Sequence, residues 1–383
     1  MYIKISLNFI SVLNLIIENH LDYLFLTIMN LAYFTMLGAV YAGLRMLKNG
    51  APEGELSVSI VIAARNEEDS ITACLESLTR LDYPEDKYEV VLVDDHSQDS
   101  TPEKIAAFCG NKANWRYILL KEKSGELRGK KNALLHGINH AKHELIFTTD
   151  ADCRVPEGWL RHMTGYFKPD VSMVLGYSPL AQGKGFLYRL LQFDNLFSAI
   201  ASAAPVKLGY PFTSVGRNLA YRKKIYEDAG GFLALKKFKS GDDVHLTERF
   251  RYLSTGKIDF CADPATFVET RLLKRIAAVF QQQIRKNSKT LIMSAGSVLI
   301  SLLIFSYYMM MISYPLLLPG SVLLWSIMMI VKFVLEFIDL RKAAHVFRQK
   351  DLMGWIPLMQ IIYPFHILLF SAIGVFQVYR WKK

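Results

Sequence analysis

The chain has 383 residues, of which 51% are hydrophobic and 21% charged, and its formal net charge is +10. Its apolar residues concentrate near residues 23–46 and 291–379, whereas residues 50–289 hold most of the charge. This division argues against a wholly soluble protein and predicts a globular unit between membrane segments, because continuous apolar stretches of about 18 residues or more are typical of spans.

The apolar ends predict membrane helices. We expect one N-terminal span at about 23–44 and three C-terminal spans at about 291–313, 316–338 and 353–378. The first apolar stretch is long and is followed by Arg45 and Lys48, a pattern that favours an uncleaved anchor over a signal peptide. By the positive-inside rule, these two cations place the next segment in the cytoplasm, so we expect a multi-pass protein of the cell (inner) membrane. Pro357 and Pro364 leave open whether the last segment crosses or re-enters.

The charge and the cysteines restrict the partners. The excess of Lys and Arg fits loops and a surface that face anionic lipid headgroups, so we predict a lipid-bilayer partner and no nucleic acid. The four cysteines are scattered, with no C-x-x-C, which is typical of a protein in a reducing compartment.

The globular part alternates strand and helix patterns. Short apolar, β-branched runs predict buried strands at 56–64, 88–93, 115–120, 145–149 and 171–177. Helical patterns are expected at 67–79, after Ser100, and at 129–141, 186–203 and from 240 onward. This alternation predicts an α/β fold with an open, mostly parallel sheet. The basic, amphipathic segment 271–289 precedes the second span and is expected to lie in the membrane interface.

Polar clusters follow three of the predicted strands. Residues 65–67 (RNE) follow the first strand, Asp94 and Asp95 the second, and Asp150 and Asp152 the fourth. In such sheets ligands bind beyond the carboxyl ends of the strands. Two carboxylates two residues apart suit Mg²⁺ or Mn²⁺ carrying a phosphate-bearing substrate. One D-x-D is expected about once by chance in a chain of this length, so the signal comes from the three clusters together.

These segments resemble a known family. Residues 58–67 (VSIVIAARNE), 93–97 (VDDHS) and Gly129-Lys130 followed by Asp150-Ala151-Asp152 resemble the family 2 glycosyltransferases, across roughly residues 56–290. The resemblance implies the GT-A fold, a Rossmann-like, mostly parallel sheet with flanking helices. One span before this unit and several after it are similar to the membrane-embedded branch, with cellulose, hyaluronan and poly-N-acetylglucosamine synthases and ceramide glucosyltransferase. The implied divisions are an anchor at 1–48, the GT-A domain at 49–270, an interfacial helix at 271–290 and a membrane region at 291–383.

The resemblance also implies roles for individual residues. Asp243 would be the general base that takes the proton from the acceptor hydroxyl. Residues that would bind the nucleotide-diphosphate sugar, expected to be a UDP-sugar, are Ala64, Arg65, Glu67, Asp94 or Asp95, Lys130, Asp150 and Arg285. Asp150 and Asp152 would hold Mg²⁺ or Mn²⁺ on the diphosphate. Residues that would line the acceptor site are Gly216, Asn218, Asp242 and Gln282. For the aspartates, capping of turns and helix starts is the structural alternative.

One departure from the family's pattern concerns the interfacial helix. The synthases carry Q-x-x-R-W there, whereas Gln282 and Arg285 are followed here by Lys286. The missing Trp favours a single transfer. The hypothesis is therefore an inverting, metal-dependent hexosyltransferase that moves a sugar to a lipid or glycan acceptor at the cytoplasmic face of the membrane. A processive polysaccharide synthase and a catalytically silent, nucleotide-binding scaffold are the alternatives.

Overall fold

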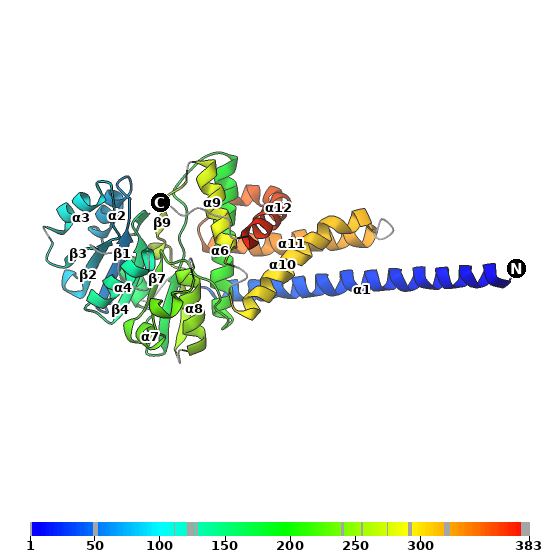
Figure 1. Ribbon diagram of the computed structural model, residues 1–383, viewed down its shortest axis with the longest axis horizontal. Helices are drawn as coiled ribbons and strands as arrows, with labels where there is room; N and C mark the ends of the chain where they lie inside the picture. The colour runs from blue at the N-terminus through cyan, green and yellow to red at the C-terminus, as the bar shows by residue number, and fades with distance from the viewer. Residues whose placement is uncertain are drawn as a thin grey trace.

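The computed structural model describes residues 2–48, 53–110, 112–120, 127, 129–238, 241–253, 256–273, 275–289, 293–317 and 322–376, without the side chains of residues 2–22. An α/β domain forms one end of the molecule, and helices α1, α10, α11 and α12 extend from it (Figure 1). Helices α6 and α9 lie between these two parts.

The central sheet has seven strands among the described residues, in the order β3-β2-β1-β4-β7-β6-β8. They are β1 (Val58–Ala64), β2 (Tyr88–Asp94), β3 (Trp115–Leu119), β4 (Leu145–Asp150), β6 (Val171–Gly176), β7 (Leu219–Arg222) and β8 (Lys257–Cys261). Only β7 pairs antiparallel with its neighbours β4 and β6. Short strands β5 (Cys153–Arg154) and β9 (Glu269–Thr270) pair separately. The predicted mostly parallel α/β sheet is confirmed, but β7 and β8 were not predicted.

Helices cover both faces of the sheet and form two cores. They include α2 (Ile71–Leu78), α3 (Thr101–Cys109), α4 (Lys130–His140), α5 (Trp159–Thr164), α6 (Phe186–Lys207), α7 (Lys223–Asp228), α8 (Asp242–Leu253) and α9 (Ile276–Asn287). In β1, Val61 joins one core and Ile60 the other, as the two-residue period of a strand requires. Helix α4 approaches β1 closely, since a Cβ at Gly137 would lie 2.4 Å from Val61. Short 3₁₀ helices are η1 (Glu85–Lys87), η2 (Phe232–Leu235), η3 (Pro264–Thr266) and η6 (Lys350–Trp355).

Three of the described helices are long and apolar enough to cross a membrane, over Tyr23–Met46, Ala295–Leu316 and Lys350–Val375. They lie in α1 (Tyr2–Met46), α10 (Ala295–Leu317) and η6 with α12 (Ile356–Val375). These agree with the expected apolar helices at 23–44, 291–313 and 353–378. The span expected at 316–338 is corrected: the corresponding helix, α11 (Val322–Val346), is shifted toward the C-terminus and carries Lys332, Glu336 and Asp339.

Two of the charges of α11, Lys332 and Glu336, are paired inside the helix bundle. The Glu336 carboxylate lies 2.9 Å from Lys332 Nζ, 2.7 Å from the hydroxyl of Tyr33 on α1 and 3.2 Å from the amide of Gln360 on α12. Tyr33 also stacks on Tyr307 of α10 at 3.8 Å between ring centroids. Buried ionisable groups in an apolar bundle require such partners, so this network joins all four helices.

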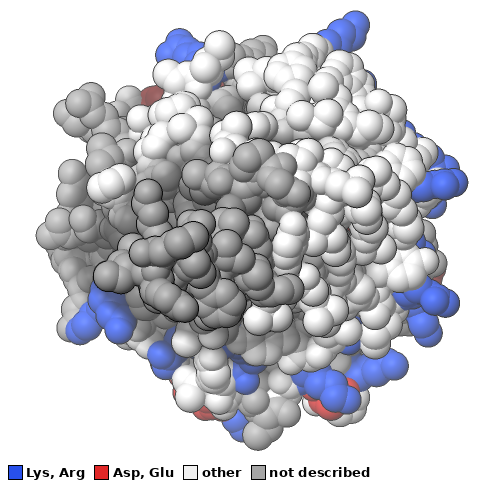
Figure 2. All heavy atoms as spheres, turned by 90° about the vertical axis from the view of Figure 1, so that its right-hand side faces the viewer, with Lys and Arg blue, Asp and Glu red and all other residues white. Residues whose placement is uncertain are grey.

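The helix bundle and the α/β domain share a core. Ala343 of α11 and Phe347, which directly follows that helix, belong to the same buried cluster as Val61 and Val93 of the sheet. Helix α1 packs against α6 so closely that a Cβ at Gly43 would lie 2.5 Å from the carbonyl oxygen of Ala204. Figure 2 shows the far end of the bundle, where uncharged side chains cover the described helices and Lys and Arg lie around the rim. That pattern is typical of a surface that meets lipid headgroups.

Candidate active site

The carboxyl ends of three parallel strands lie side by side. In the sheet register Ala64 of β1 pairs with Asp94 of β2, and Ala63 pairs with Asp150 of β4. Beyond these ends opens a cleft of about 1210 Å³. Its lining contains twelve of the predicted site residues: Ala64, Arg65, Glu67, Asp95, Lys130, Asp150, Asp152, Gly216, Asp242, Asp243, Gln282 and Arg285. The structure thus brings together residues spread over most of the globular part of the chain.

The loops after β1 and β2 are joined by hydrogen bonds. The Asn66 N–H donates to Ser97 Oγ at 2.9 Å, and the Glu67 N–H donates to Thr101 Oγ1 at 2.8 Å. Asn66 and His96 adopt positive φ values of 52° and 60°. Asn tolerates this left-handed conformation better than most residues, and the tight turns it permits fix both loops at the cleft edge.

Asp94 and Asp95 have different environments. Asp95 lines the cleft, with its carboxylate 3.0 Å from His96 Nδ1 and 3.8 Å from Arg65 Nη1. Asp94 is completely buried, and its Oδ1 accepts the Ser97 N–H at 2.8 Å. Asp95 is therefore the one of the two that lines the cleft, while Asp94 holds the loop and keeps its Oδ2 buried without a hydrogen-bond partner among the described residues; nucleotide contact by either residue stays a prediction.

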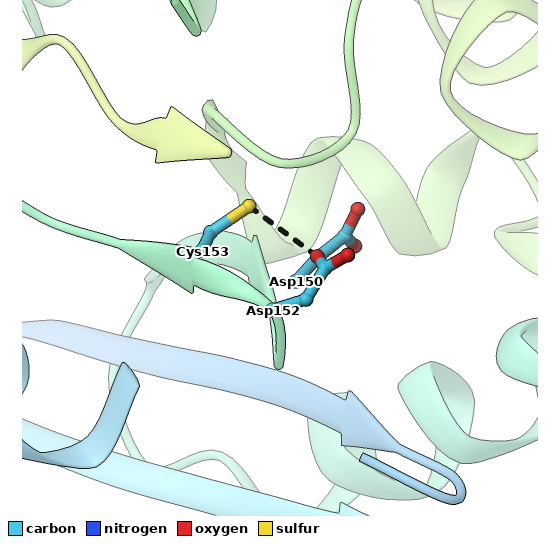
Figure 3. A group of neighbouring side chains, drawn as sticks. All are labelled: Asp150, Asp152 and Cys153. Carbon is cyan, nitrogen blue, oxygen red and sulfur yellow. Dashed lines mark hydrogen bonds between the residues drawn. The ribbon is translucent and has the colours of Figure 1, made fainter. Parts of the chain in front are cut away.

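Asp150 and Asp152 point into the cleft from the end of β4 (Figure 3). Ligand atoms of Asp150, Asp152 and Cys153 lie within 4.8 Å of one another, and Cys153 Sγ is 3.7 Å from Asp152 Oδ1. Burial, together with Asp150 and Glu67, raises the pKa of Asp152. Burial also raises the pKa of the Cys153 thiol, which therefore stays protonated. The two carboxylates fit a hard cation such as Mg²⁺ or Mn²⁺, whose charge would relieve the repulsion between them, whereas a protonated thiol is not a ligand for such an ion.

Lys130, in the first turn of α4, forms an ion pair with Asp150. Burial opposes the charge of this lysine, but Asp150, Asp242 and Asp243 outweigh that effect and raise its pKa. Burial likewise opposes the charge of Asp150, and Lys130 with Arg217 lowers its pKa overall. Both groups are thus charged at neutral pH, and Lys130 places a positive charge beside Asp150 in the cleft.

Asp243 is held in the first turn of α8 by two backbone amides. Its Oδ2 accepts the Gly216 N–H at 2.9 Å, and its Oδ1 accepts the Val244 N–H at 3.0 Å and lies 3.7 Å from Lys289 Nζ. Burial raises the pKa of Asp243, but Lys289, Lys130 and the two amides together lower it below its usual value. Asp243 is therefore ionised at neutral pH and able to accept a proton.

Asp242 faces the opposite situation. Burial and the neighbouring Asp243 raise its pKa, although Lys130 and Lys131 act against them. Its nearest cation is Lys131, whose Nζ lies 3.9 Å away. The pKa is thus raised for Asp242 and lowered for the adjacent Asp243, so Asp243 is the better candidate for a base.

Asn218, which was predicted to line the acceptor site, does not reach the cleft. Its side chain is completely buried and lies outside the cleft lining. It donates to the carbonyls of Tyr177 and Thr266 at 2.7 and 2.8 Å and accepts the Trp159 Nε1–H at 3.0 Å. All of its bonds therefore serve the core. Gly216, by contrast, does lie in the cleft, where a Cβ would be 3.3 Å from Asp243 Cβ.

Sequence reasoning missed Arg217 and the far wall of the cleft. Arg217 lines the cleft, lowers the pKa of Asp150 and opposes the rise in that of Asp152. A single arginine between glycine and asparagine has no motif that would have identified it. The far wall consists of side chains from α10 and α12, among them Phe305 and Ile367. Only tertiary packing brings those helices to the cleft.

Comparison with known proteins identifies a family that resembles this chain. Residues 59–230 match the family model described as Glycosyl transferase family 2. Glycosyltransferase AglE of Haloferax volcanii is 28% identical over 193 residues, which are 50% of this chain and 60% of that protein. Beta-monoglucosyldiacylglycerol synthase of Trichormus variabilis is 33% identical over 132 residues, which are 34% of this chain and 28% of that protein. The matches therefore span less than two thirds of either relative.

A solved structure shares the overall fold. The mannosyltransferase PcManGT from Pyrobaculum calidifontis, in complex with GDP-Man and Mn²⁺, superposes with a TM-score of 0.58 at 19% identity, over 91% of this chain and 93% of that one. The GT-A architecture expected from the sequence is thereby confirmed.

Proposed function

Since the chain carries a family 2 glycosyltransferase domain that uses a nucleotide-sugar donor, we propose that it is an inverting, metal-dependent transferase with a membrane-lipid acceptor. One observation carries the proposal: a single cleft joins Asp150, Asp152 and Asp243 to the walls of α10 and α12. A soluble acceptor would not require an apolar wall from two candidate membrane spans, whereas a lipid would lie against one with its headgroup near the carboxylates.

The residues of the cleft would have different roles according to their positions. Asp95 and Arg65 would contact the nucleotide, and Lys130 and Arg285 would contact the diphosphate. Asp150 and Asp152 would hold Mg²⁺ or Mn²⁺, which when bound offsets the charge that develops on the leaving diphosphate.

Asp243 would take the proton from the acceptor hydroxyl as that oxygen attacks the anomeric carbon. One direct displacement inverts the anomeric configuration, because the acceptor oxygen forms its bond on the face opposite the bond to the leaving diphosphate; retention by double displacement would need a carboxylate as nucleophile. We place this chemistry at the cytoplasmic face, since Arg45 and Lys48 directly follow the first apolar helix. The proposed domain limits remain 1–48, 49–270, 271–290 and 291–383.

The test uses the full chain in phosphatidylcholine discs that contain total membrane lipid. Radiolabelled UDP-glucose, UDP-N-acetylglucosamine and GDP-mannose are supplied separately, with Mn²⁺, with Mg²⁺ or with EDTA. We expect label to enter the organic phase with at least one donor, and only when metal is present. Full activity in EDTA would refute metal dependence. Label found only in water-soluble product would refute the lipid acceptor.

A further inference from the structure

Asp194 of α6 is the centre of a buried polar cluster at the membrane end of the cleft. Its carboxylate lies 2.8 Å from Lys286 Nζ and 3.0 Å from Gln283 Nε2, both on α9, and accepts the hydroxyl of Tyr363 on α12 at 2.8 Å. All four residues line the cleft. In Figure 1, α6 and α9 lie between the α/β domain and the extended helices, and α12, one of those helices, contacts both of them. The cluster therefore lies where a headgroup would enter from the bilayer.

Two side-chain oxygens next to Asp194 have no hydrogen-bond partner among the described residues. The amide group of Gln283 donates to Asp194, which leaves its Oε1 buried and unpaired. The amide group of Asn195 donates to the Ser178 carbonyl at 3.0 Å, which leaves its Oδ1 in the same state. Both amide orientations are fixed because each NH₂ faces an oxygen acceptor. Buried polar atoms are rarely left unpaired, so both oxygens indicate a ligand that brings donors.

The charge of the cluster restricts that ligand further. The carboxylate of Asp194 is matched by the ammonium of Lys286 at 2.8 Å, and His366 Nε2 lies 4.0 Å from its Oδ1, so no unmatched negative charge remains to attract a cation. A phosphate would add only acceptor oxygens beside the carbonyl oxygens of Gln283 and Asn195. Hydroxyl groups donate without bringing charge.

We propose that Asn195 and Gln283 bind hydroxyl groups of an uncharged polyol headgroup, a sugar or glycerol, on the acceptor lipid. This inference rests on the proposed function and names the class of acceptor. The apolar side chains of Phe305 and Ile367, which line the same cleft from α10 and α12, would contact the acyl part of that lipid.

The experiment measures lipid specificity in two variants from different helices. Gln283→Met and Asn195→Leu each remove one unpaired oxygen. Asn114→Leu is the matched control, because that amide also donates to backbone carbonyls but lies outside the cleft lining. The acceptor probes are dioleoylglycerol carrying one glucose, dioleoylglycerol and dioleoylphosphatidic acid, each in phosphatidylcholine discs.

We expect the KM for the better of the two uncharged lipids to rise about fivefold in each cleft variant, as the loss of one neutral hydrogen bond implies. The donor KM should stay within twofold, and phosphatidic acid should not compete. Comparison of the first two probes shows whether a sugar or glycerol supplies the hydroxyls. An unchanged lipid KM in both variants, the same change in Asn114→Leu, or competition by phosphatidic acid would overturn the proposal.

A separate binding arm distinguishes this inference from the proposed function. If the wild type transfers sugar neither to the probes nor to total membrane lipid, the lipid-acceptor proposal fails, and binding of radiolabelled glucosyl dioleoylglycerol to the discs is compared instead. Binding that weakens about fivefold in both cleft variants but not in Asn114→Leu would support the polyol site. Equal binding in all four proteins would overturn it.

Discussion

Asp243→Asn removes the proposed base while keeping the size of the side chain. A positioned general base contributes about 10²- to 10⁴-fold to a rate, or about 3 to 5 kcal/mol of transition-state stabilisation. Asp243 meets the structural requirement for that role, because its two carboxylate oxygens are fixed by the amides of Gly216 and Val244. We therefore expect kcat for sugar transfer to fall at least a hundredfold, with little change in donor affinity.

The same substitution has a smaller structural cost. Asn offers one oxygen and one NH₂, so one of the two amide hydrogen bonds of Asp243 is lost. That loss amounts to about 1 to 3 kcal/mol of folding stability, and it does not by itself slow the chemical step. Thermal unfolding of the variant and calorimetric titration with the donor separate the two effects. Asp228→Asn is a suitable control, since Asp228 is an exposed residue near the end of α7.

The assay is the initial rate of label transfer into extracted lipid at saturating donor and Mn²⁺. A rate within threefold of the wild type, with unchanged unfolding and donor binding, would show that Asp243 is not the base. A hundredfold loss in the Asp228→Asn control would equally invalidate the comparison.

Three further predictions concern the metal, the pH dependence and the core. Asp152→Asn should raise the Mn²⁺ concentration for half-maximal activity about tenfold or more in a metal titration, because one of two carboxylate ligands is lost. If that Mn²⁺ concentration did not change, the metal would have to bind elsewhere. Lys289→Met removes the main cation that lowers the pKa of Asp243, so the acid limb of the kcat/KM profile, which follows ionisation of the base, should move to higher pH. A limb that does not move would contradict this. Asn218→Leu should lower the thermal unfolding temperature, because the loss of three buried hydrogen bonds costs about 3 kcal/mol of folding stability. The acceptor KM should not change. A rise in the acceptor KM without a loss of stability would support the predicted acceptor role of Asn218.

The strands in the parallel half of the sheet could be predicted because each has a clear pattern in the sequence. β1, β2 and β4 are apolar runs that are buried along nearly their whole length and end in polar residues. The short strand β7 gave no such signal, because it has four residues and directly precedes α7. Its antiparallel pairing with β4 and β6 depends on partners far away in the chain.

The candidate site was predictable in its residue types but not in their orientations. Adjacent aspartates at a strand end turn in different directions, and only the fold shows that Asp95 faces the cleft while Asp94 faces inward. The same applies to Gly216 and Asn218, two residues apart, of which only the first lies in the cleft. Hydropathy placed the second C-terminal helix, α11, too early for a different reason. A hydropathy average treats every charged residue as unfavourable in a span, whereas in the folded bundle Glu336 is stabilised by contacts with three other residues.

Lys286, which stands where processive synthases carry Trp, has a definite structural role. Its ammonium neutralises Asp194, whose side chain is only 11% exposed, whereas Lys286 itself is 42% exposed. Removing one partner of such a pair leaves a buried charge unmatched, which costs more than removing both. Lys286→Met should therefore lower the unfolding temperature more than the double variant Asp194→Asn with Lys286→Met. If the two single substitutions were additive, the ion pair would be unimportant, and Lys286 would be available to contact a substrate instead.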